Sequence, residues 1–304
     1  MNALCKGVLR ALAYAAIFRY PLRLEEIDRY FIGPRPLHYS RSKLVKALNY
    51  LLEKKAIAFH SGYYFLPGQT GIVNRRLQHE SYSGPKLALA KKTAFWLGLI
   101  PAVRLIGITG SLAMSNCRSD DDIDLIIISS PHRLWLTRFA SIIITEILGR
   151  RRRRTDCRVS NKICLNMFLD TDHLSLPPAE RNLYAAHEIT QIKTLVNRCH
   201  TYERFLAANR WLNQYLPNAK ADRQKSPPCR QKSFILLDFL EKMFFSLQLK
   251  KMSAYQTNEI AEPGRIRFHP LDCTGRILVS YRRRLTRLGL SQGQNPLDKN
   301  ITSS

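Results

Sequence analysis

The sequence predicts an α+β protein whose central part has an α/β pattern. Three observations support this fold class. Residues 102–172 alternate between apolar, strand-like runs and helix-like segments, residues 3–68 contain three helix-like stretches and two short strand-like runs, and most of the chain after residue 175 has helical periodicity. The length of 304 residues allows two domains, and a hydrophobic content of 45% is enough to bury a core.

Changes in periodicity divide the chain into five segments. They are an N-terminal module (residues 1–68), a connecting helix (69–100), a core (101–175), a helical C-terminal region (176–290) and a disordered tail (291–304). In the core we expect strands at 103–109, 123–129 and 162–169 and helices at 112–116 and 134–148. Other helices are expected after Gly84-Pro85, from Lys86 to Leu99, and at 178–196, 202–215, 233–251 and 276–288.

The N-terminal module has the element order of a small DNA-binding fold. Ser40 can cap its third helix, and a tight hairpin suits the two strand-like runs that follow. Three helices followed by a hairpin resemble a winged helix, a family in which the third helix often reads DNA. The basic side chains of this helix are Arg41, Lys43 and Lys46. A DNA contact through residues 40–66 is one interpretation. The other is a module that packs against protein, because no arrangement of Asn, Gln or Arg predicts base readout.

The chain carries 48 basic and 23 acidic residues, which gives a formal charge of +25. Such a charge favours acidic partners such as nucleic acid, nucleotides or anionic surfaces, although a generally basic proteome would produce it too. The basic residues are spread over the whole length, whereas a nucleic-acid face would concentrate them. The one dense run, Arg150–Arg154, fits either a solvated loop or a contact with a phosphate-rich partner.

The seven cysteines include no Cys-x-x-Cys pair, and their odd number argues against a disulfide framework and a zinc site. Reduced thiols and a cytoplasmic location are therefore expected. The most apolar stretches, 134–148 and 234–249, are short and interrupted by charged residues. We expect them to form buried amphipathic helices, with no membrane span.

The most informative string runs from Gly110-Ser111, through ten residues, to Asp122 and Asp124 at the start of an apolar strand. Carboxylates at positions i and i+2 of a strand point to the same face, close enough to share divalent cations. Mg²⁺ favours carboxylate oxygens together with phosphates, and two such ions can activate a hydroxyl and stabilise leaving pyrophosphate. Gly110 allows a phosphate to approach the backbone, the Ser111 hydroxyl can hold the end of a triphosphate, and Arg118 could add positive charge.

This string resembles the signature of the DNA polymerase β-like nucleotidyltransferase superfamily, in which Gly-Ser and a spacer precede Asp-x-Asp. The resemblance covers about residues 85–175 and implies a core with a small mixed β-sheet. It also implies that Gly110 and Ser111 bind the triphosphate, and that the catalytic Asp122 and Asp124 bind two Mg²⁺ ions. A calcium loop or an acidic turn is the competing interpretation, but it leaves the apolar strands on both sides of the string unexplained.

The chain departs from the superfamily pattern at the third carboxylate, which usually comes from a later strand. The matching position is Cys164, and Asn166 lies two residues on, on the same face of the expected strand. Neither is a good general base for a hydroxyl at neutral pH. The third acid could come from Asp170, Asp172 or Glu188, the metals and the substrate could suffice for slow chemistry, or the site could bind nucleotide without catalysis.

The expected function is transfer of a nucleoside monophosphate from a nucleoside triphosphate to a hydroxyl of a small molecule, protein or nucleic acid, with release of pyrophosphate. The alternative is a nucleotide-sensing, DNA-binding regulator, which Cys164 and the charge of +25 support. A second alternative is a scaffold in which both modules bind only protein.

Overall fold

The computed structural model describes residues 1–33, 39–69, 71–153, 155–219, 235–253, 260–267 and 272–290. Its centre is a six-stranded sheet with the strand order β6-β3-β4-β5-β8-β7. The strands are β3 (Val103–Ile108), β4 (Ile123–Ser129), β5 (Ile163–Asp170), β6 (Lys193–Asn197), β7 (Ile260–Glu262) and β8 (Arg265–Arg267). β4 and β5 run parallel, and the other neighbours run antiparallel. The protein is therefore a mixed α+β fold.

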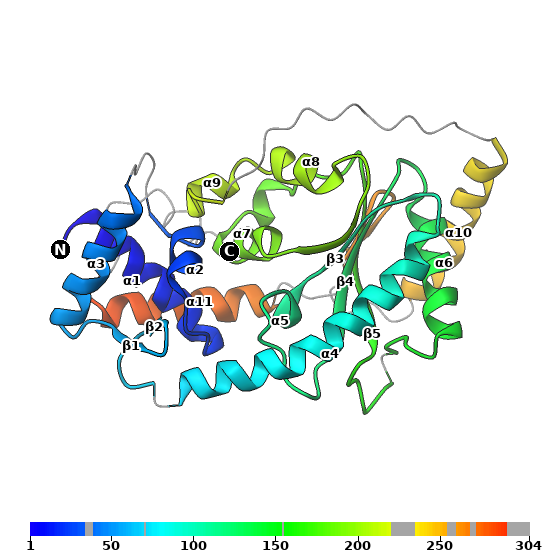
Figure 1. Ribbon diagram of the computed structural model, residues 1–304. Coiled ribbons are helices and arrows are strands. Elements are labelled where there is room, and N and C mark those ends of the chain that lie inside the picture. The colour runs from blue at the N-terminus through cyan, green and yellow to red at the C-terminus, as the bar shows by residue number, and fades with distance from the viewer. Residues whose placement is uncertain are drawn as a thin grey trace.

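The two faces of the sheet bury separate hydrophobic cores, because side chains alternate along each strand. On one face, Leu125 and Ile127 of β4 pack with α4 (Ile72–Gly98), α6 (Leu134–Ile147) and α10 (Ile235–Ser253). On the other face, Ile126 and Ile128 pack into a core that reaches the N-terminal module and the remaining C-terminal helices. These helices are α7 (Leu183–Thr190), α8 (Thr201–Ala208), α9 (Leu212–Tyr215) and α11 (Asp272–Arg287). Figure 1 shows the N-terminal module at one end of the molecule and α6 and α10 at the other.

The N-terminal module contains the elements that the sequence predicts, in the same order. They are α1 (Ala3–Ala15), which η1 (Ala16–Phe18) extends, α2 (Leu24–Arg29), α3 (Arg41–Glu53), β1 (Ala58–His60) and β2 (Tyr63–Phe65). Ser40 caps α3 by accepting a hydrogen bond from the Lys43 amide, as expected, and Leu22 pairs with Tyr64 to extend the hairpin. Lys43 and Lys46 lie on the exposed outer face of α3.

The connecting helix α4 is longer than the sequence predicts. It begins at Ile72 and continues through Pro85 to Gly98, whereas a helix starting after Gly84-Pro85 is expected. Its first half buries the polar side chains of Arg76, His79 and Ser83, which give no apolar periodicity to recognise. In Figure 1, α4 runs from the N-terminal module to the sheet and so connects the two directly.

The C-terminal region contains strands as well as helices, which corrects the helical prediction for residues 176–290. After η2 (Pro178–Glu180), the helix expected at 178–196 is reduced to α7, and the following residues form β6, in which Val196 pairs with Ile106 of β3. β8 pairs with β5 at the other side of the sheet. Strands of three to five residues are too short for their alternation to be distinguished from a helix. The tail at 291–304 lies outside the described residues.

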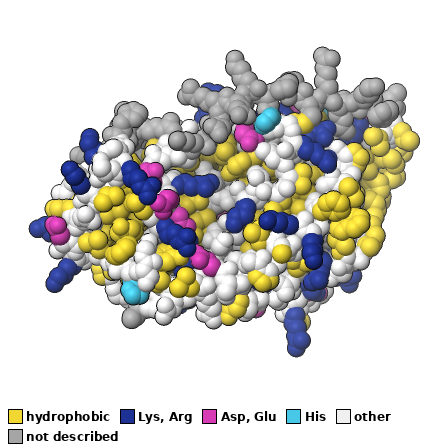
Figure 2. All heavy atoms as spheres, in the orientation of Figure 1, with side chains coloured by type: hydrophobic (Ala, Val, Ile, Leu, Met, Phe, Trp, Pro, Cys, Tyr) yellow, Lys and Arg dark blue, Asp and Glu magenta, His cyan; other side chains and the backbone are white. Residues whose placement is uncertain are grey.

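Three further expectations concern the distribution of charge, membrane spans and the state of the cysteines. Figure 2 shows Lys and Arg side chains spread along the visible face, as their distribution in the sequence predicts. Among the helices that the structure describes, none is long and apolar enough to cross a bilayer. Cys199 is disulfide-bonded, which corrects the expectation that all thiols are reduced. The free cysteines among the described residues are Cys5, Cys117, Cys157, Cys164 and Cys273.

Candidate functional site

The Gly-Ser bend lies directly against the aspartate pair. Gly110 begins the short helix α5 (Gly110–Ala113) with a φ of 64°, a value that favours glycine. A Cβ atom added at Gly110 would lie 2.9 Å from Oδ2 of Asp124. The Thr109 amide also donates to the carbonyl oxygen of Asp124 over 3.0 Å. Glycine is therefore required here both by the backbone angle and by the close approach of the carboxylate.

Asp122, Asp124 and Cys164 form a compact cluster in which one ligand atom from each lies within 4.8 Å of the others. The parallel pairing of β4 and β5 places Asp124 opposite Cys164. Asp122 and Asp124 therefore converge on one side of the sheet, as the sequence predicts. Burial raises the pKa of the Asp122 carboxyl and neighbouring Asp124 raises it further, whereas the Arg152 guanidinium lowers it.

Arg152, from the run Arg150–Arg154, contacts this cluster, and the sequence does not predict that contact. Its Nη1 donates to Oδ2 of Asp122 over 2.5 Å and lies 3.8 Å from Sγ of Cys164. The Arg152 amide donates to the carbonyl oxygen of Ile163 over 2.9 Å, which holds this end of the arginine run beside β5. The arginine run is therefore more than a solvated loop, because one of its members supplies the counter-charge of the carboxylate pair.

Cys164 cannot replace the missing carboxylate. Burial raises the pKa of its thiol well above the usual value, and Asp124 and Asp122 raise it further. Without a metal the group is therefore a protonated thiol, which is not a base for a hydroxyl, and sulfur is in any case not a ligand that Mg²⁺ favours.

Asn166 falls on a β-bulge. Leu125 pairs with Leu165 and Ile126 pairs with Met167, so Asn166 is the extra residue of β5. Its Oδ1 is buried and has no hydrogen-bond partner among the described residues. The side chain lines a small cavity of about 70 Å³, which is separate from the cluster of Asp122, Asp124 and Cys164.

The three candidates for a third acid lie in different places. Oδ1 of Asp170 accepts from the amides of Asp172 and His173, so Asp170 stabilises the turn at the far end of β5. Asp172 is exposed in that turn. Glu188 lines a cavity together with Gly110 and Ser111. Within the described part of the chain, no third carboxylate joins the cluster, and Glu188 shares a cavity with the Gly-Ser bend.

Ser111 and Arg118 are both exposed, and both donate a hydrogen bond to Asp121. The Ser111 hydroxyl donates to Oδ2 of Asp121 over 3.1 Å, and the Arg118 amide donates to the same oxygen over 2.8 Å. The Arg118 guanidinium pairs with Asp120 over 3.0 Å and is 62% exposed. These contacts tie the loop to the Gly-Ser bend. The Arg118 side chain contributes to loop structure and leaves the counter-charge role to Arg152.

One face of α4 holds the loop between the Gly-Ser bend and the aspartates. The contacts are His79 Nδ1 to the Asn116 carbonyl oxygen (3.1 Å), Ser83 Oγ to Cys117 Sγ (3.0 Å) and Lys86 Nζ to the Asp121 carbonyl oxygen (2.6 Å). The three α4 residues are buried and spaced so that they share one side of the helix. His79 and Ser83 belong to the part of α4 before Pro85, where the sequence predicts no helix, and this part supports the candidate site.

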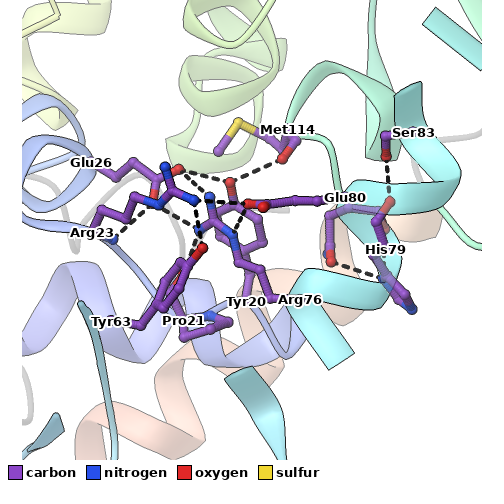
Figure 3. Close-up of polar contacts among 11 residues, drawn as sticks. Tyr20, Pro21, Arg23, Glu26, Tyr63, Arg76, His79, Glu80, Ser83 and Met114 are labelled. Carbon is purple, nitrogen blue, oxygen red and sulfur yellow. Dashed lines mark hydrogen bonds and ion pairs between the residues drawn. The ribbon is translucent and has the colours of Figure 1, made fainter. Parts of the chain in front are cut away.

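A buried polar cluster around Arg76 joins this support to the N-terminal module (Figure 3). The Arg76 guanidinium is 4.0 Å from the centre of the Tyr20 ring. Its hydrogen bonds go to the Pro21 carbonyl oxygen (2.6 Å), to both Glu26 carboxylate oxygens (2.8 and 2.9 Å) and to Glu80 Oε1 (2.9 Å). The Tyr20 hydroxyl in turn lies 2.9 Å from the carbonyl oxygen of Met114, just after α5. The cluster therefore connects α2, α4 and the loop that follows the Gly-Ser bend.

Comparison with known proteins assigns no function to these residues. No protein-family model matches the chain, and no curated protein is significantly similar to it.

Proposed function

We propose that the protein is a Mg²⁺-dependent nucleotidyltransferase, which moves a nucleoside monophosphate from a nucleoside triphosphate to an acceptor hydroxyl and releases pyrophosphate. The observation that carries the proposal is the convergence of the Asp122 and Asp124 carboxylates within 4.8 Å, directly beside Gly110. Two like charges in a partly buried position favour a cation, and a triphosphate brings the remaining oxygen ligands that Mg²⁺ prefers.

The donor atoms fit Mg²⁺ only in part. The aspartate oxygens are suitable ligands, whereas the protonated Cys164 thiol is not. A bound Mg²⁺ would polarise the phosphate and activate the attacking hydroxyl. A second ion would take most of its ligands from the triphosphate and water, because no third carboxylate of the described residues joins the cluster.

The chain's own residues have distinct parts in this proposal. Gly110 gives a phosphate room to approach, and the exposed Ser111 hydroxyl and the first amides of α5 can hold it. Arg152 neutralises the carboxylate pair before a metal binds. Because Cys164 supplies no base, we expect slow turnover.

Nucleotide binding and pyrophosphate release, each with and without Mg²⁺, test the proposal in the wild type and in Asp124→Asn. We expect the variant to lose Mg²⁺-dependent binding and release. Asp120→Asn is the matched control, because Asp120 is exposed and lies outside the cluster, and it should behave as the wild type does. A wild-type protein that binds no nucleoside triphosphate would overturn the proposal and leave the protein scaffold as the remaining reading.

A nucleotide-sensing, DNA-binding regulator is the second candidate. The protonated thiol at Cys164 and the exposed basic face of α3 favour it. Nucleotide binding without pyrophosphate release would support it, together with salt-dependent binding of duplex DNA. In that case Lys46→Ala should weaken DNA binding and reduce the slope of log K against log[salt] by about 1, the value expected for one phosphate contact. Glu53→Gln, at the far end of α3, serves as the control.

A further inference from the structure

A cavity of about 290 Å³ lies between the N-terminal module, the Gly-Ser bend and α7. Two helical faces form it, each with residues at positions i, i+3, i+4 and i+7. The first face is Ala11, Tyr14, Ala15 and Phe18, and the second is Tyr184, His187, Glu188 and Gln191. This spacing puts all four residues of each set on one side of their helix.

Small and aromatic side chains give the cavity its shape. Ala11 and Ala15 offer only methyl groups, which leaves space beside this face of α1. The rings of Tyr14 and His187 stack with centroids 3.9 Å apart and an interplanar angle of 9°. The rings of Tyr20 and Tyr30 complete the wall on the side of the N-terminal module. A lining of this kind suits a flat, unsaturated ring.

Three polar atoms in and beside the cavity have no hydrogen-bond partner among the residues that the structure describes. His187 is 4% exposed, and its Nε2 has no hydrogen-bond partner among the described residues. Tyr184 and Glu188 also line the adjoining cavity of about 70 Å³. In that cavity Thr109 Oγ1 and Asn166 Oδ1 are buried without partners among the described residues. Buried polar atoms in this state are rare in native proteins and point to a polar ligand.

The cavity shares the Gly-Ser bend with the candidate site. Gly110 and Ser111 line it, and the backbone of Gly110 also lies against the Asp124 carboxylate. A ligand in the cavity would therefore contact the Gly-Ser bend, and the remainder of a larger ligand could extend from this bend toward the aspartate pair.

We propose that this cavity binds the base of the nucleoside triphosphate. The inference rests on the nucleotide binding of the proposed function, but not on catalysis. The volume is at the lower end of the range of about 300–1,000 Å³ for small-molecule sites, which suits one ring system better than a large acceptor. Glu188 and Gln191 offer hydrogen-bonding groups to the ring edge.

A base in this position would touch the N-terminal module directly. Tyr14, Tyr20 and Tyr30 belong to the module, whereas Tyr184 and His187 belong to the C-terminal region. Nucleotide binding would therefore stabilise the junction between these two parts of the chain, whether or not the nucleotide is turned over.

Calorimetric titration in Mg²⁺ with ATP, GTP, CTP, UTP and inorganic tripolyphosphate tests the inference. In the wild type we expect the tightest nucleotide to bind roughly 5- to 150-fold more tightly than tripolyphosphate, the range that corresponds to stacking of one base on aromatic side chains. Ala15→Leu would place a larger side chain in the cavity and obstruct it, so it should reduce this advantage and leave the affinity for tripolyphosphate unchanged. Ala208→Leu, at an exposed position of α8, is the matched control.

A second variant covers the case in which Ala15→Leu does not fold. Tyr184→Ala removes one wall of the cavity and adds no side-chain atoms that the fold must accommodate. It should weaken nucleotide binding while tripolyphosphate binds as before. Equal affinities of the wild type for nucleotides and tripolyphosphate would overturn the inference and leave the proposed function intact. The inference would also be overturned if Ala15→Leu folded and kept the full preference for nucleotide. Failure of every one of these ligands to bind would instead overturn the proposed function.

Discussion

The carboxylates of Asp122 and Asp124 are held close together although nothing in their own strand offsets their charge. Arg152 does so from another part of the chain, through its contact with Asp122. A divalent cation at the same carboxylates would compete with this guanidinium, because both are attracted by the same negative charge. Arg152 therefore offsets the repulsion between the two carboxylates, and it also weakens the binding of a metal to them.

Arg152→Gln should bind Mg²⁺ more tightly than the wild type. Removing one nearby positive charge is expected to improve the affinity by roughly tenfold, which corresponds to about 1.4 kcal/mol. Titration with Mg²⁺ alone measures the effect. Arg153→Gln is the control, since Arg153 pairs with Glu146 and not with the cluster. Equal Mg²⁺ affinities for Arg152→Gln and the wild type would show that Arg152 does not compete with the metal.

His187 should make the protein less stable in acid. Burial lowers the pKa of His187 to about 3, against an ordinary value of about 6.5. As the pH falls through 6.5, the unfolded chain gains a proton on this side chain but the folded protein does not, so the stabilisation present at neutral pH is lost. The loss approaches about 1.4 kcal/mol for each pH unit between 6.5 and 3.

Urea unfolding at several pH values between 7 and 4.5 measures this loss. His187→Phe keeps a ring against Tyr14 but cannot titrate, so its free energy of unfolding should depend on pH less steeply than that of the wild type. Identical slopes in the two proteins would mean that His187 is protonated normally in the folded state.

Sequence and structure agree on the aspartates and the Gly-Ser bend for a local reason. All four residues belong to one string of 15 residues, bounded by two apolar strands that pair in the sheet. Arg152 and His187 reach their sites through contacts with distant parts of the chain, which no local pattern encodes. Asn166 lies on the face of the sheet that alternation predicts, because it lines a cavity with Ile126, although the β-bulge makes it the extra residue of β5.

At the scale of elements, α4 determines how the site is held. Its residues contact the N-terminal module at one end and the acidic loop in the middle, and it packs against β3 at the other end. The sequence hides this role, because polar side chains replace the apolar stripe in its first half and Pro85 interrupts the pattern. The short strands β6, β7 and β8 are missed for a different reason, since tertiary pairing and not local preference makes them strands.

Arg76→Ala should destabilise the protein strongly. The side chain is 5% exposed, and its loss would leave the carboxylate of Glu26 partly buried without its main partner. Breaking a buried pair in this way costs about 3–5 kcal/mol. Lys91→Ala, on the exposed side of the same helix, should change the free energy of unfolding by less than about 0.5 kcal/mol. Chemical denaturation measures the free energy of unfolding of both variants. Similar changes in the two would show that Arg76 does not stabilise the contact between the N-terminal module and α4.

At the scale of the whole molecule, the N-terminal module and the sheet share one hydrophobic core. It contains Leu12 of α1, Ile126 of β4, Leu183 of α7 and Leu285 of α11. The sequence predicts the elements of the module but not this junction, because the contacts join residues that are more than a hundred positions apart. The aromatic cavity lies in the same junction, which places a ligand site where the parts of the chain meet.

The central claim is that Asp122 and Asp124 hold a divalent cation against a triphosphate at the Gly-Ser bend. Crystals soaked with Mn²⁺ and a non-hydrolysable nucleoside triphosphate test it most directly, because the anomalous scattering of Mn²⁺ locates the ion. We predict a Mn²⁺ peak bound by both carboxylates, with phosphate oxygens beside Ser111. Arg152 should no longer contact Asp122. A peak elsewhere, with Asp122 still paired to Arg152, would contradict the account.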